Sequence, residues 1–304
     1  MSLKHENIIK KMSLEEKALM MSGKDTWQTQ DFPQYGIPSM MQSDGPHGMR
    51  TQPPEAGDHL GINESMPATC FPTAATIANT WDEKLGEEIG KALAEEAISM
   101  GVHVVLGPGL NIKRSPLCGR NFEYVSEDPF LTGEVAAALT KGVQQEDGYY
   151  VTVKHFACNN MEDNRNKVSS NLSERALREI YLRGFERAVR KGKAKGIMTS
   201  YNRINSVYAP NSYDLCTKVL RNEWGFDGVV MTDWFSTNKG LGHNALAMRA
   251  GNDLIMPGGG SYKKEILAGV KSGMMKEDDV RRCCANVVRA IMNSATQKEY
   301  IDKK

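Results

Sequence analysis

Polar and charged residues follow several apolar runs in this 304-residue chain, and their types suit acid–base and binding chemistry. Asp44 comes after the segment IPSMMQS, and Asp233 comes after GVVMT. Lys154 and His155 are neighbours after YYVTV, and Tyr201 follows GIMTS. A carboxylate can act as a nucleophile or a base, an amine can attack a carbonyl carbon, and an imidazole can carry a proton. If these runs are strands that end at one edge of a sheet, the side chains are expected to share a site.

Each of these residues also has a purely structural explanation. Asp44 stands before a Gly-Pro pair, where a carboxylate commonly caps a turn, and this explanation is as good as a functional one. Lys154 and His155 would most simply be an exposed dipeptide. Asp233 is different, because a carboxylate buried after an apolar run is costly unless it has partners or faces a cleft. For Asp233 the functional interpretation is favoured.

Two further residues complete the candidate set. Arg120, in GRNFEYVSEDP, is as well explained by ion pairs with nearby acidic residues as by ligand binding. Trp234 is either a core residue or an aromatic surface for the apolar face of a sugar ring. The set lacks the His/Cys spacing of a zinc site and a phosphate-cradling glycine loop. Carboxylates, cations, an imidazole and aromatic rings together suit a polyhydroxylated ligand, so a carbohydrate is expected.

Helical and strand-like segments alternate along the chain and would position these residues. An amphipathic segment at 81–101 is followed by an apolar run, and the same order recurs further along. Seven segments are predicted to be strands: 37–45, 72–78, 102–109, 149–156, 196–202, 228–234 and 252–259. This alternation predicts an α/β fold with a mostly parallel sheet. A (β/α)8-like barrel of the TIM type is favoured over an open sheet, although an eighth strand is not evident.

Helix starts and domain limits follow from similar patterns. Three sites have the capping-box spacing, in which two side chains satisfy free amides at a helix start. They are Ser13 with Glu16, Thr80 with Glu83, and Asn171 with Glu174. Residues 1–30 are predicted to be an N-terminal helical extension, and residues 31–304 a catalytic barrel domain. A last amphipathic helix is predicted over 276–296.

Composition argues against several classes of function. There are 38 Lys and Arg residues against 37 Asp and Glu, so the net charge of +1 gives no reason to expect a nucleic-acid partner. No Gly-x-Gly-x-x-Gly turn follows an early strand, and neither a cofactor nor a metal is expected. No apolar stretch has the length of a signal peptide or a membrane span. Six cysteines without a C-x-x-C pair favour reduced thiols and a cytoplasmic protein.

Six segments of the chain resemble, in order, motifs of the N-terminal barrel of glycoside hydrolase family 3, of the β-glucosidase type. They are SDGPHGMR, GRNFEYVSEDP, KHFACNNMEDNR, IMTSYNRIN, GFDGVVMTDW and AGNDLIMPG, and they extend over almost the whole chain. The resemblance implies retaining hydrolysis of terminal non-reducing β-D-glucosyl residues or related glycosides, with Asp233 as the nucleophile. It also implies a sugar pocket lined by Asp44, Arg120, Lys154, His155, Arg165, Met198, Tyr201 and Trp234.

This chemistry needs two carboxyl groups, one attacking the anomeric carbon and one protonating the leaving oxygen. Asp233 must be ionised to attack, and Lys154, Arg120 or Arg165 would favour its charged form by direct attraction. Tyr201 could orient Asp233 by donating its hydroxyl hydrogen.

The proton donor is the missing part of this scheme. Family members of the β-glucosidase type normally continue into a second α/β domain that contributes the acid/base Glu, so this group is expected from such a domain or from a second chain. Glu123, Glu127 and Glu162 are weaker candidates, because their segments do not supply the acid in the family. Two alternatives stay open: a catalytically incomplete barrel that binds glycans, and a lyase in which Lys154 forms a Schiff base.

Overall fold

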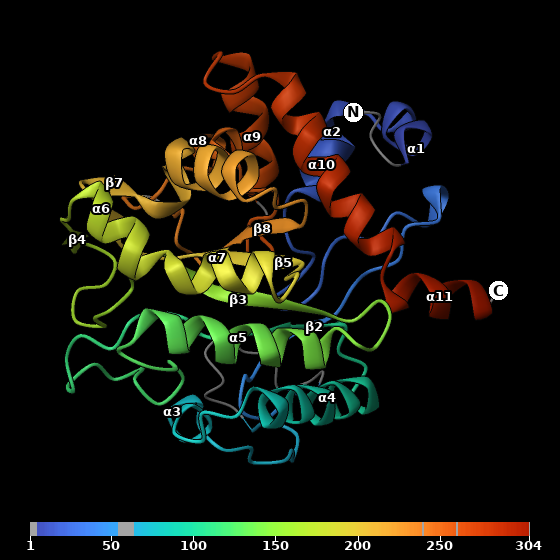
Figure 1. Ribbon diagram of the computed structural model, residues 1–304. Helices are drawn as coiled ribbons and strands as arrows, with labels where there is room; N and C mark the ends of the chain where they lie inside the picture. The colour runs from blue at the N-terminus through green and yellow to red at the C-terminus, as the bar shows by residue number, and fades with distance from the viewer. Residues whose placement is uncertain (1–4, 54–63, 239, 260, 304) are drawn as a thin grey trace.

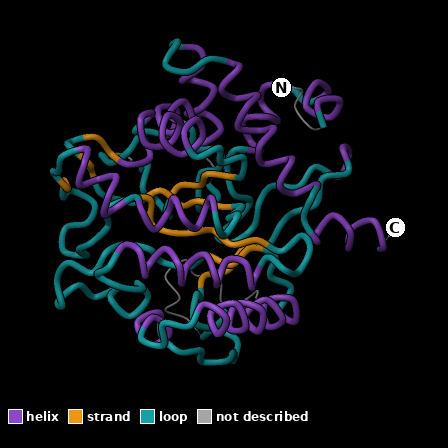
Figure 2. The backbone as a smooth tube through the Cα atoms, viewed as in Figure 1, coloured by secondary structure: helices purple, strands orange, loops and turns teal. Residues whose placement is uncertain are grey.

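The computed structural model describes residues 5–53, 64–238, 240–259 and 261–303. Parallel strands occupy the centre of the molecule, and helices surround them (Figures 1 and 2). The sheet has the order β1-β2-β3-β5-β8, and every neighbouring pair is parallel. Its strands are β1 (Gln42–Asp44), β2 (Val104–Leu106), β3 (Tyr150–Phe156), β5 (Gly196–Thr199) and β8 (Val229–Thr232). Their carboxyl ends therefore meet at one edge.

Helices cover the sheet on both sides. In Figure 1, α4 and α5 lie below the strands, whereas α8, α9 and α10 lie above them. The α-helices are α1 (Glu6–Lys11), α2 (Leu14–Met20), α3 (Ala74–Ala78), α4 (Glu83–Ser99), α5 (Pro129–Val143), α6 (Glu174–Ala176), α7 (Arg183–Arg190), α8 (Asn244–Ala250), α9 (Tyr262–Lys271), α10 (Glu277–Met292) and α11 (Ala295–Asp302). None of the described helices has both the length and the apolar composition needed to cross a bilayer.

The fold also contains several shorter elements. Three very short strands form a second sheet in the order β4-β6-β7. They are β4 (Ser169–Ser170), β6 (Arg203–Ile204) and β7 (Val207–Tyr208). Two segments wind as π-helices, η3 (Leu177–Tyr181) and η5 (Asp214–Glu223), and two turns are 3₁₀-helical, η1 (Pro33–Tyr35) and η4 (Ala209–Asn211).

Successive side chains of the central strands point to opposite faces, as strand geometry requires. Val151 and Val153 of β3 pack into a core cluster together with residues of α4, α5 and α7. Met198 and Met231 instead belong to a second cluster, together with residues of α1, α2 and α10. Both faces of the sheet are therefore buried, which explains why its strands appear in the sequence as short continuous apolar runs.

The prediction of an α/β fold with a mostly parallel sheet is confirmed, but the strand list needs two corrections. Segment 72–78 contains helix α3, in which the Thr73 hydroxyl accepts a hydrogen bond from the Thr76 amide; its alanines favour a helix. Segment 252–259 makes single bridges, Met231 to Leu254 and Ser22 to Ile255, and no extended strand. Among the described residues the hydrogen-bonded parallel sheet thus has five strands, and a closed eight-stranded barrel is not seen.

The predicted helix starts are correct in part. Ser13 and Glu16 form the expected capping box, with bonds of 3.1 and 2.8 Å. Helix α4 is capped by Asp82, not by Thr80, and α6 is capped by Ser173, two residues after the predicted Asn171. In both cases a side chain nearer to the first turn is available and reaches its amides first. The predicted helix at 276–296 is divided into α10 and α11.

Candidate active site

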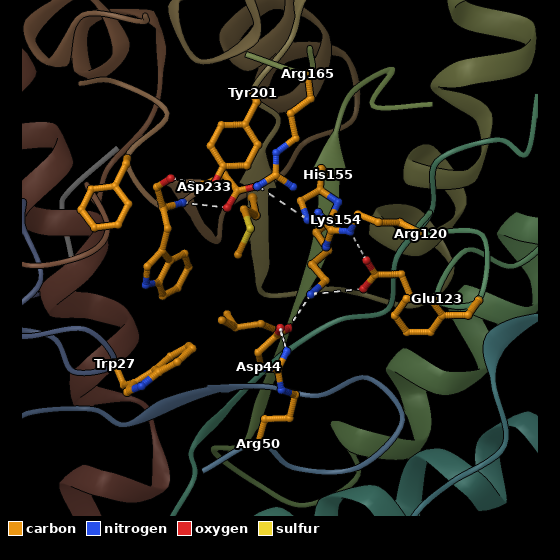
Figure 3. Close-up of a pocket in the computed structure, with 15 residues that line it drawn as sticks. Trp27, Asp44, Arg50, Arg120, Glu123, Lys154, His155, Arg165, Tyr201 and Asp233 are labelled. Atoms are coloured by element: carbon orange, nitrogen blue, oxygen red, sulfur yellow. Dashed lines mark hydrogen bonds and ion pairs between the residues drawn. The ribbon is translucent and has the colours of Figure 1, made fainter. Parts of the chain in front are cut away.

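A cavity of about 310 Å³ lies at the carboxyl edge of the sheet, where the strand ends bring polar residues together (Figure 3). Asp44 ends β1, Tyr201 follows β5, and Asp233 follows β8 directly. Lys154 and His155 both line the cavity although they are adjacent in β3. Strict alternation would send them to opposite faces, and the register of β3 against β5 shifts between Val153 and Phe156.

All nine residues proposed from the sequence line this one cavity: Asp44, Arg120, Lys154, His155, Arg165, Met198, Tyr201, Asp233 and Trp234. Sequence reasoning did not assign the other six lining residues to the pocket: Trp27, Arg50, Leu106, Phe122, Glu123 and Phe235. Trp27, Phe122 and Glu123 lie in loops without any strand-end pattern, so nothing in their spacing marks them. The structure brings the predicted set together, while the role of each residue remains a proposal.

Asp233 is buried, with only 7% of its surface exposed, and its two oxygens differ. Oδ1 accepts a hydrogen bond of 2.7 Å from the backbone N–H of Trp234. Oδ2 has no hydrogen-bond partner among the described residues, and Nε2 of His155 lies 3.6 Å from it. One oxygen is thus fixed by the backbone, while the other is available to a ligand.

The electrostatic environment of Asp233 differs from the expectation. Burial raises the pKa of Asp233 above its ordinary value. Arg120, Arg165 and Lys154 act in the opposite direction, as predicted, and so does the hydrogen bond from the Trp234 amide. Because burial outweighs these cations, the attraction alone does not hold the pKa of this carboxyl at or below its ordinary value.

Tyr201 lies beside Asp233 and contacts the backbone next to it. Its hydroxyl donates a hydrogen bond of 2.6 Å to the carbonyl oxygen of Trp234. The Arg165 guanidinium lies over the Tyr201 ring, 4.4 Å from its centroid. Burial and the neighbouring Asp233 charge raise the pKa of Tyr201, so its hydroxyl stays protonated. Tyr201 therefore anchors the backbone next to Asp233. A side-chain hydrogen bond with Asp233 also contributes to the raised pKa of Tyr201, and the orienting role expected of Tyr201 stays a prediction.

Lys154 joins two acidic groups on the opposite wall of the cavity (Figure 3). Its Nζ lies 2.5 Å from Oδ1 of Asp44 and 3.6 Å from Oε2 of Glu123. Glu123 is also ion-paired with Arg120. Burial alone would raise the pKa of Asp44, but Lys154 and more distant guanidinium groups outweigh it, so this pKa lies below its ordinary value. These groups form a fixed array of charged donors and acceptors.

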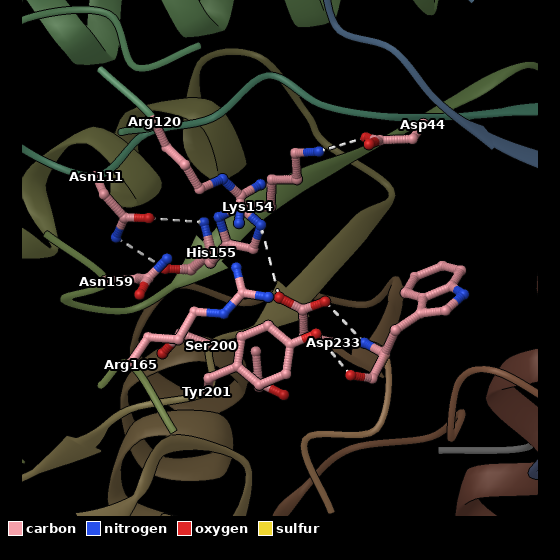
Figure 4. Close-up of polar contacts among 12 residues, drawn as sticks. Asp44, Asn111, Arg120, Lys154, His155, Asn159, Arg165, Ser200, Tyr201 and Asp233 are labelled. Atoms are coloured by element: carbon pink, nitrogen blue, oxygen red, sulfur yellow. Dashed lines mark hydrogen bonds and ion pairs between the residues drawn. The ribbon is translucent and has the colours of Figure 1, made fainter. Parts of the chain in front are cut away.

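His155 is held by its backbone and by its ring (Figure 4). Its N–H donates to Oδ1 of Asn111 at 3.1 Å, and its carbonyl accepts from Nδ2 of the same residue at 2.9 Å. On the ring, Nδ1 lies 3.0 Å from the Tyr124 hydroxyl. Burial, followed by the charges of nearby cations, lowers the pKa of His155 well below its usual value, so the imidazole is neutral. Asn111 follows β2 with the same polar-after-strand pattern and could have been singled out.

Aromatic rings form a third wall. Trp27 and Trp234 lie with ring centroids 5.5 Å apart, and Nε1 of Trp234 donates to the carbonyl of Thr26 at 3.1 Å. Phe122 and Phe235 also line the cavity. A small ligand with several hydroxyl groups and one apolar face would meet suitable partners on every side.

None of the three glutamates considered from the sequence is well placed as a proton donor. Both oxygens of Glu123 face cations, Arg120 and Lys154. Glu162 accepts a hydrogen bond of 2.7 Å from Arg165, and Glu127 is exposed and does not line the cavity. Among the described residues, no group of three or more His, Cys, Asp or Glu side chains could hold a metal ion.

Comparison with known proteins gives the site a context. The model of the glycosyl hydrolase family 3 N-terminal domain matches residues 11–290. The chain is 46% identical over 300 residues to the thermostable beta-glucosidase B of Acetivibrio thermocellus, covering 98% of this chain and 39% of that protein. It is 44% identical over 282 residues to an exo-alpha-(1->6)-L-arabinopyranosidase of Bifidobacterium longum, covering 92% and 36%.

Solved structures agree. Beta-glucosidase 3B from Thermotoga neapolitana in complex with glucose superposes with a TM-score of 0.90 at 40% identity, covering 98% of this chain and 44% of that one. The chain spans less than half the length of these relatives. The resemblance found in the sequence motifs is confirmed, and the chain belongs to glycosyl hydrolase family 3, whose N-terminal domain it matches.

Proposed function

We propose that this chain is the nucleophile-bearing part of a retaining β-glycosidase that removes terminal non-reducing β-D-glucosyl residues. The observation that carries the proposal is the state of Asp233, a buried carboxylate with one oxygen fixed by a backbone amide and the other without a hydrogen-bond partner among the described residues. Relatives named beta-glucosidases support the choice of substrate class.

In this mechanism, Oδ2 of Asp233 attacks the anomeric carbon while the bond from that carbon to the leaving oxygen breaks. Water then hydrolyses the glycosyl–Asp233 ester, which releases the sugar with its configuration retained. Arg120, Arg165 and Lys154 favour the anionic form of Asp233 against the cost of its burial. A bound sugar removes water from Asp233, so it must also provide polar partners that keep this carboxylate ionised.

The other predicted residues bind the sugar in this proposal. Asp44, Lys154 and His155 offer acceptors and donors to its hydroxyl groups, and Trp234 offers a surface for the apolar face of the ring. Contacts to the hydroxyl next to the anomeric carbon that strengthen in the transition state would lower the barrier. The volume of about 310 Å³ is at the low end of small-molecule pockets, which suits one sugar unit.

The acid/base carboxyl is proposed to come from outside this chain, from a second α/β domain or a second chain. The relatives are more than twice as long as the segment that matches, which leaves room for such a domain. Positioned acid–base help is worth about 10² to 10⁴-fold in rate. The isolated chain should therefore process only substrates whose leaving group needs no proton.

The alternatives are weaker on this geometry. A Schiff-base lysine must be desolvated and unpaired, whereas Lys154 is ion-paired with Asp44 and Glu123. A glycan-binding barrel without catalysis is distinguished from the proposed enzyme by the labelling experiment below. We further propose a closed TIM-type barrel and a domain limit at residue 30. A cytoplasmic location is also proposed, and the six free cysteines support it.

The test uses 2-deoxy-2-fluoro-β-D-glucosyl fluoride, in which fluoride leaves without protonation. Attack by Asp233 forms the C1–O bond as the C1–F bond breaks, so intact-mass and peptide mass spectrometry should find the sugar ester on Asp233. Natural disaccharides should be hydrolysed very poorly by the same sample. Absence of the adduct in folded protein that binds glucose would instead support the glycan-binding barrel.

A further inference from the structure

Behind the cavity wall, a row of buried polar side chains runs away from His155. Tyr124 and Asn159 are at most 1% exposed, and neither lines the cavity. The Tyr124 hydroxyl lies 3.0 Å from Nδ1 of His155 and 3.2 Å from Nδ2 of Asn159. Nδ2 of Asn159 also lies 3.1 Å from Oε1 of Glu162. Figure 4 shows Asn159 beside His155, on the side away from Asp233.

The direction of each hydrogen bond in this row can be worked out from its end. Glu162 is held by Arg165 at 2.7 Å, and its carboxylate can only accept. The Asn159 amide must therefore present its NH₂ group to Glu162, because a flipped amide would set oxygen against oxygen. That NH₂ group has two hydrogens, one for Glu162 and one for the Tyr124 oxygen.

The remaining hydrogen is that of Tyr124. Its oxygen accepts from Asn159, so its single O–H is free to donate to Nδ1 of His155. The neutral His155 ring carries one proton, and with Nδ1 acting as an acceptor this proton lies on Nε2. Nε2 is the ring nitrogen that faces Asp233, 3.6 Å from Oδ2.

We propose that Tyr124, Asn159 and Glu162 are positioning residues that hold His155 in the Nε2–H tautomer, with its N–H directed at the Asp233 carboxylate. This inference rests on the proposed function for its purpose: the N–H stabilises the anionic nucleophile and a sugar hydroxyl bound between the two. In the other tautomer, a lone pair would face the carboxylate and repel it. The row also links Arg165, which holds Glu162, to the His155 ring.

The tautomer is measured directly on the intact chain, with ¹⁵N-histidine labelling and long-range ¹H–¹⁵N correlation. The His155 signals are identified by their absence in His155→Gln. The expected spectrum shows a protonated Nε2 and an unprotonated Nδ1. A His155 ring protonated on Nδ1, or an even mixture of both forms, would overturn the proposal without any variant.

Two variants then test the row itself. Tyr124→Phe removes the donor and should leave a mixture of tautomers, whereas Asn159→Asp replaces the donor to Tyr124 with an acceptor and should move the proton toward Nδ1. The control is Tyr149→Phe. The Tyr149 ring stacks on His103 and its hydroxyl lies 3.4 Å from Oε1 of Glu299, so its removal should leave the His155 tautomer unchanged. An unaltered Nε2–H signal in both Tyr124→Phe and Asn159→Asp would contradict the positioning role of this row.

Adduct formation gives the functional readout. Tyr124→Phe should slow labelling of Asp233 by about tenfold, with glucose affinity changed much less, since the hydrogen bond acts mainly on the reacting carboxylate. If His155 shows the expected tautomer but Asp233 is never labelled, the proposed function is contradicted and the positioning role of the row is retained. If Asp233 is labelled but His155 is protonated on Nδ1, only the positioning role of the row is contradicted.

Discussion

Two buried aspartates adjoin apolar runs in this chain, Asp233 at the end of one and Asp253 at the start of another, yet their surroundings are opposite. Asp253 is fully buried, and its carboxylate is satisfied on both oxygens: Oδ2 by Arg221 at 2.5 Å and by a β8 amide at 2.9 Å, Oδ1 by Asn286 at 2.9 Å. In addition, Nη1 of Arg282 lies 3.6 Å from Oδ1 of Asp253. Asp233 has one backbone hydrogen bond and one oxygen without any such partner among the described residues.

The difference supports a structural role for Asp253 and the nucleophilic role proposed for Asp233. Asp253 links α10 and the π-helical η5 to Val230 near the start of β8 through charged hydrogen bonds, and both of its oxygens are occupied. Asp233 retains an unused acceptor at the cost of desolvation, which raises its pKa. A buried charge without hydrogen-bond partners is costly, and such groups with perturbed pKa values are typical of ligand-binding cavities.

The largest effect is expected at the reactive carboxylate. Asp233→Asn keeps the size of the side chain but removes the nucleophilic oxygen, so labelling by 2-deoxy-2-fluoro-β-D-glucosyl fluoride should slow by about 10⁴-fold or more. The rate is followed by intact-mass spectrometry, with circular dichroism to show that the fold is kept. Labelling of another residue at the wild-type rate would contradict the role of Asp233.

At the structural carboxylate, the loss should appear in stability instead. Asp253→Asn leaves Arg221 without its charged partner and leaves the partly exposed Arg282 with Asp279 alone, and should lower the free energy of unfolding by about 3 kcal/mol. Urea unfolding measures this loss. The rate of Asp233 labelling per folded molecule should be unchanged; a large fall would mean that Asp253 also supports the site.

A third carboxylate, Asp44, lies between these extremes because it is ion-paired and also lines the cavity. Lys154→Met should weaken glucose binding by about tenfold, since it removes a charged donor and leaves Asp44 and Glu123 without their shared cation. Isothermal titration calorimetry measures the affinity. Lys195→Met is the matched control, because Lys195 pairs with Asp227 at 3.6 Å at the surface. Equal losses in both variants would contradict a binding role for Lys154.

The sequence could predict the ends of strands but not the partners of these aspartates. Asp44, Lys154 and Asp233 were predicted from the polar residues that end apolar runs, which parallel strands bring to one edge. Asp253 stands in a similar apolar setting, and its partner Arg221 comes from η5, 32 positions earlier in the chain. Local patterns carry no information on such pairings, which depend on how distant helices pack.

Three further differences between the predictions and the structure have separate causes. The segment 72–78 has the apolar run of a strand, yet its alanines and the Thr73 cap make it helix α3. Glu123 and Tyr124 stand in a loop without periodicity, and only the fold places one in the cavity and the other behind His155. Resemblance to family motifs supplied Arg165 and Met198, which no strand-end argument had selected.

The smallest effect is a pH dependence of stability that arises from the raised pKa of Asp233. The folded pKa of Asp233 is raised, so this group contributes stability that is fully present below its unfolded pKa and is lost as pH rises through the folded pKa. Asp233→Asn should therefore be more stable than the wild type at neutral pH, by less than the loss in Asp253→Asn. The gap should close below about pH 4, where the unfolded carboxyl is also protonated. Urea unfolding of the wild type and of Asp233→Asn from pH 3.5 to 7.5, a range of about four units around these values, measures the gap. A destabilised Asp233→Asn at neutral pH would mean that Asp233, like Asp253, is a satisfied structural charge.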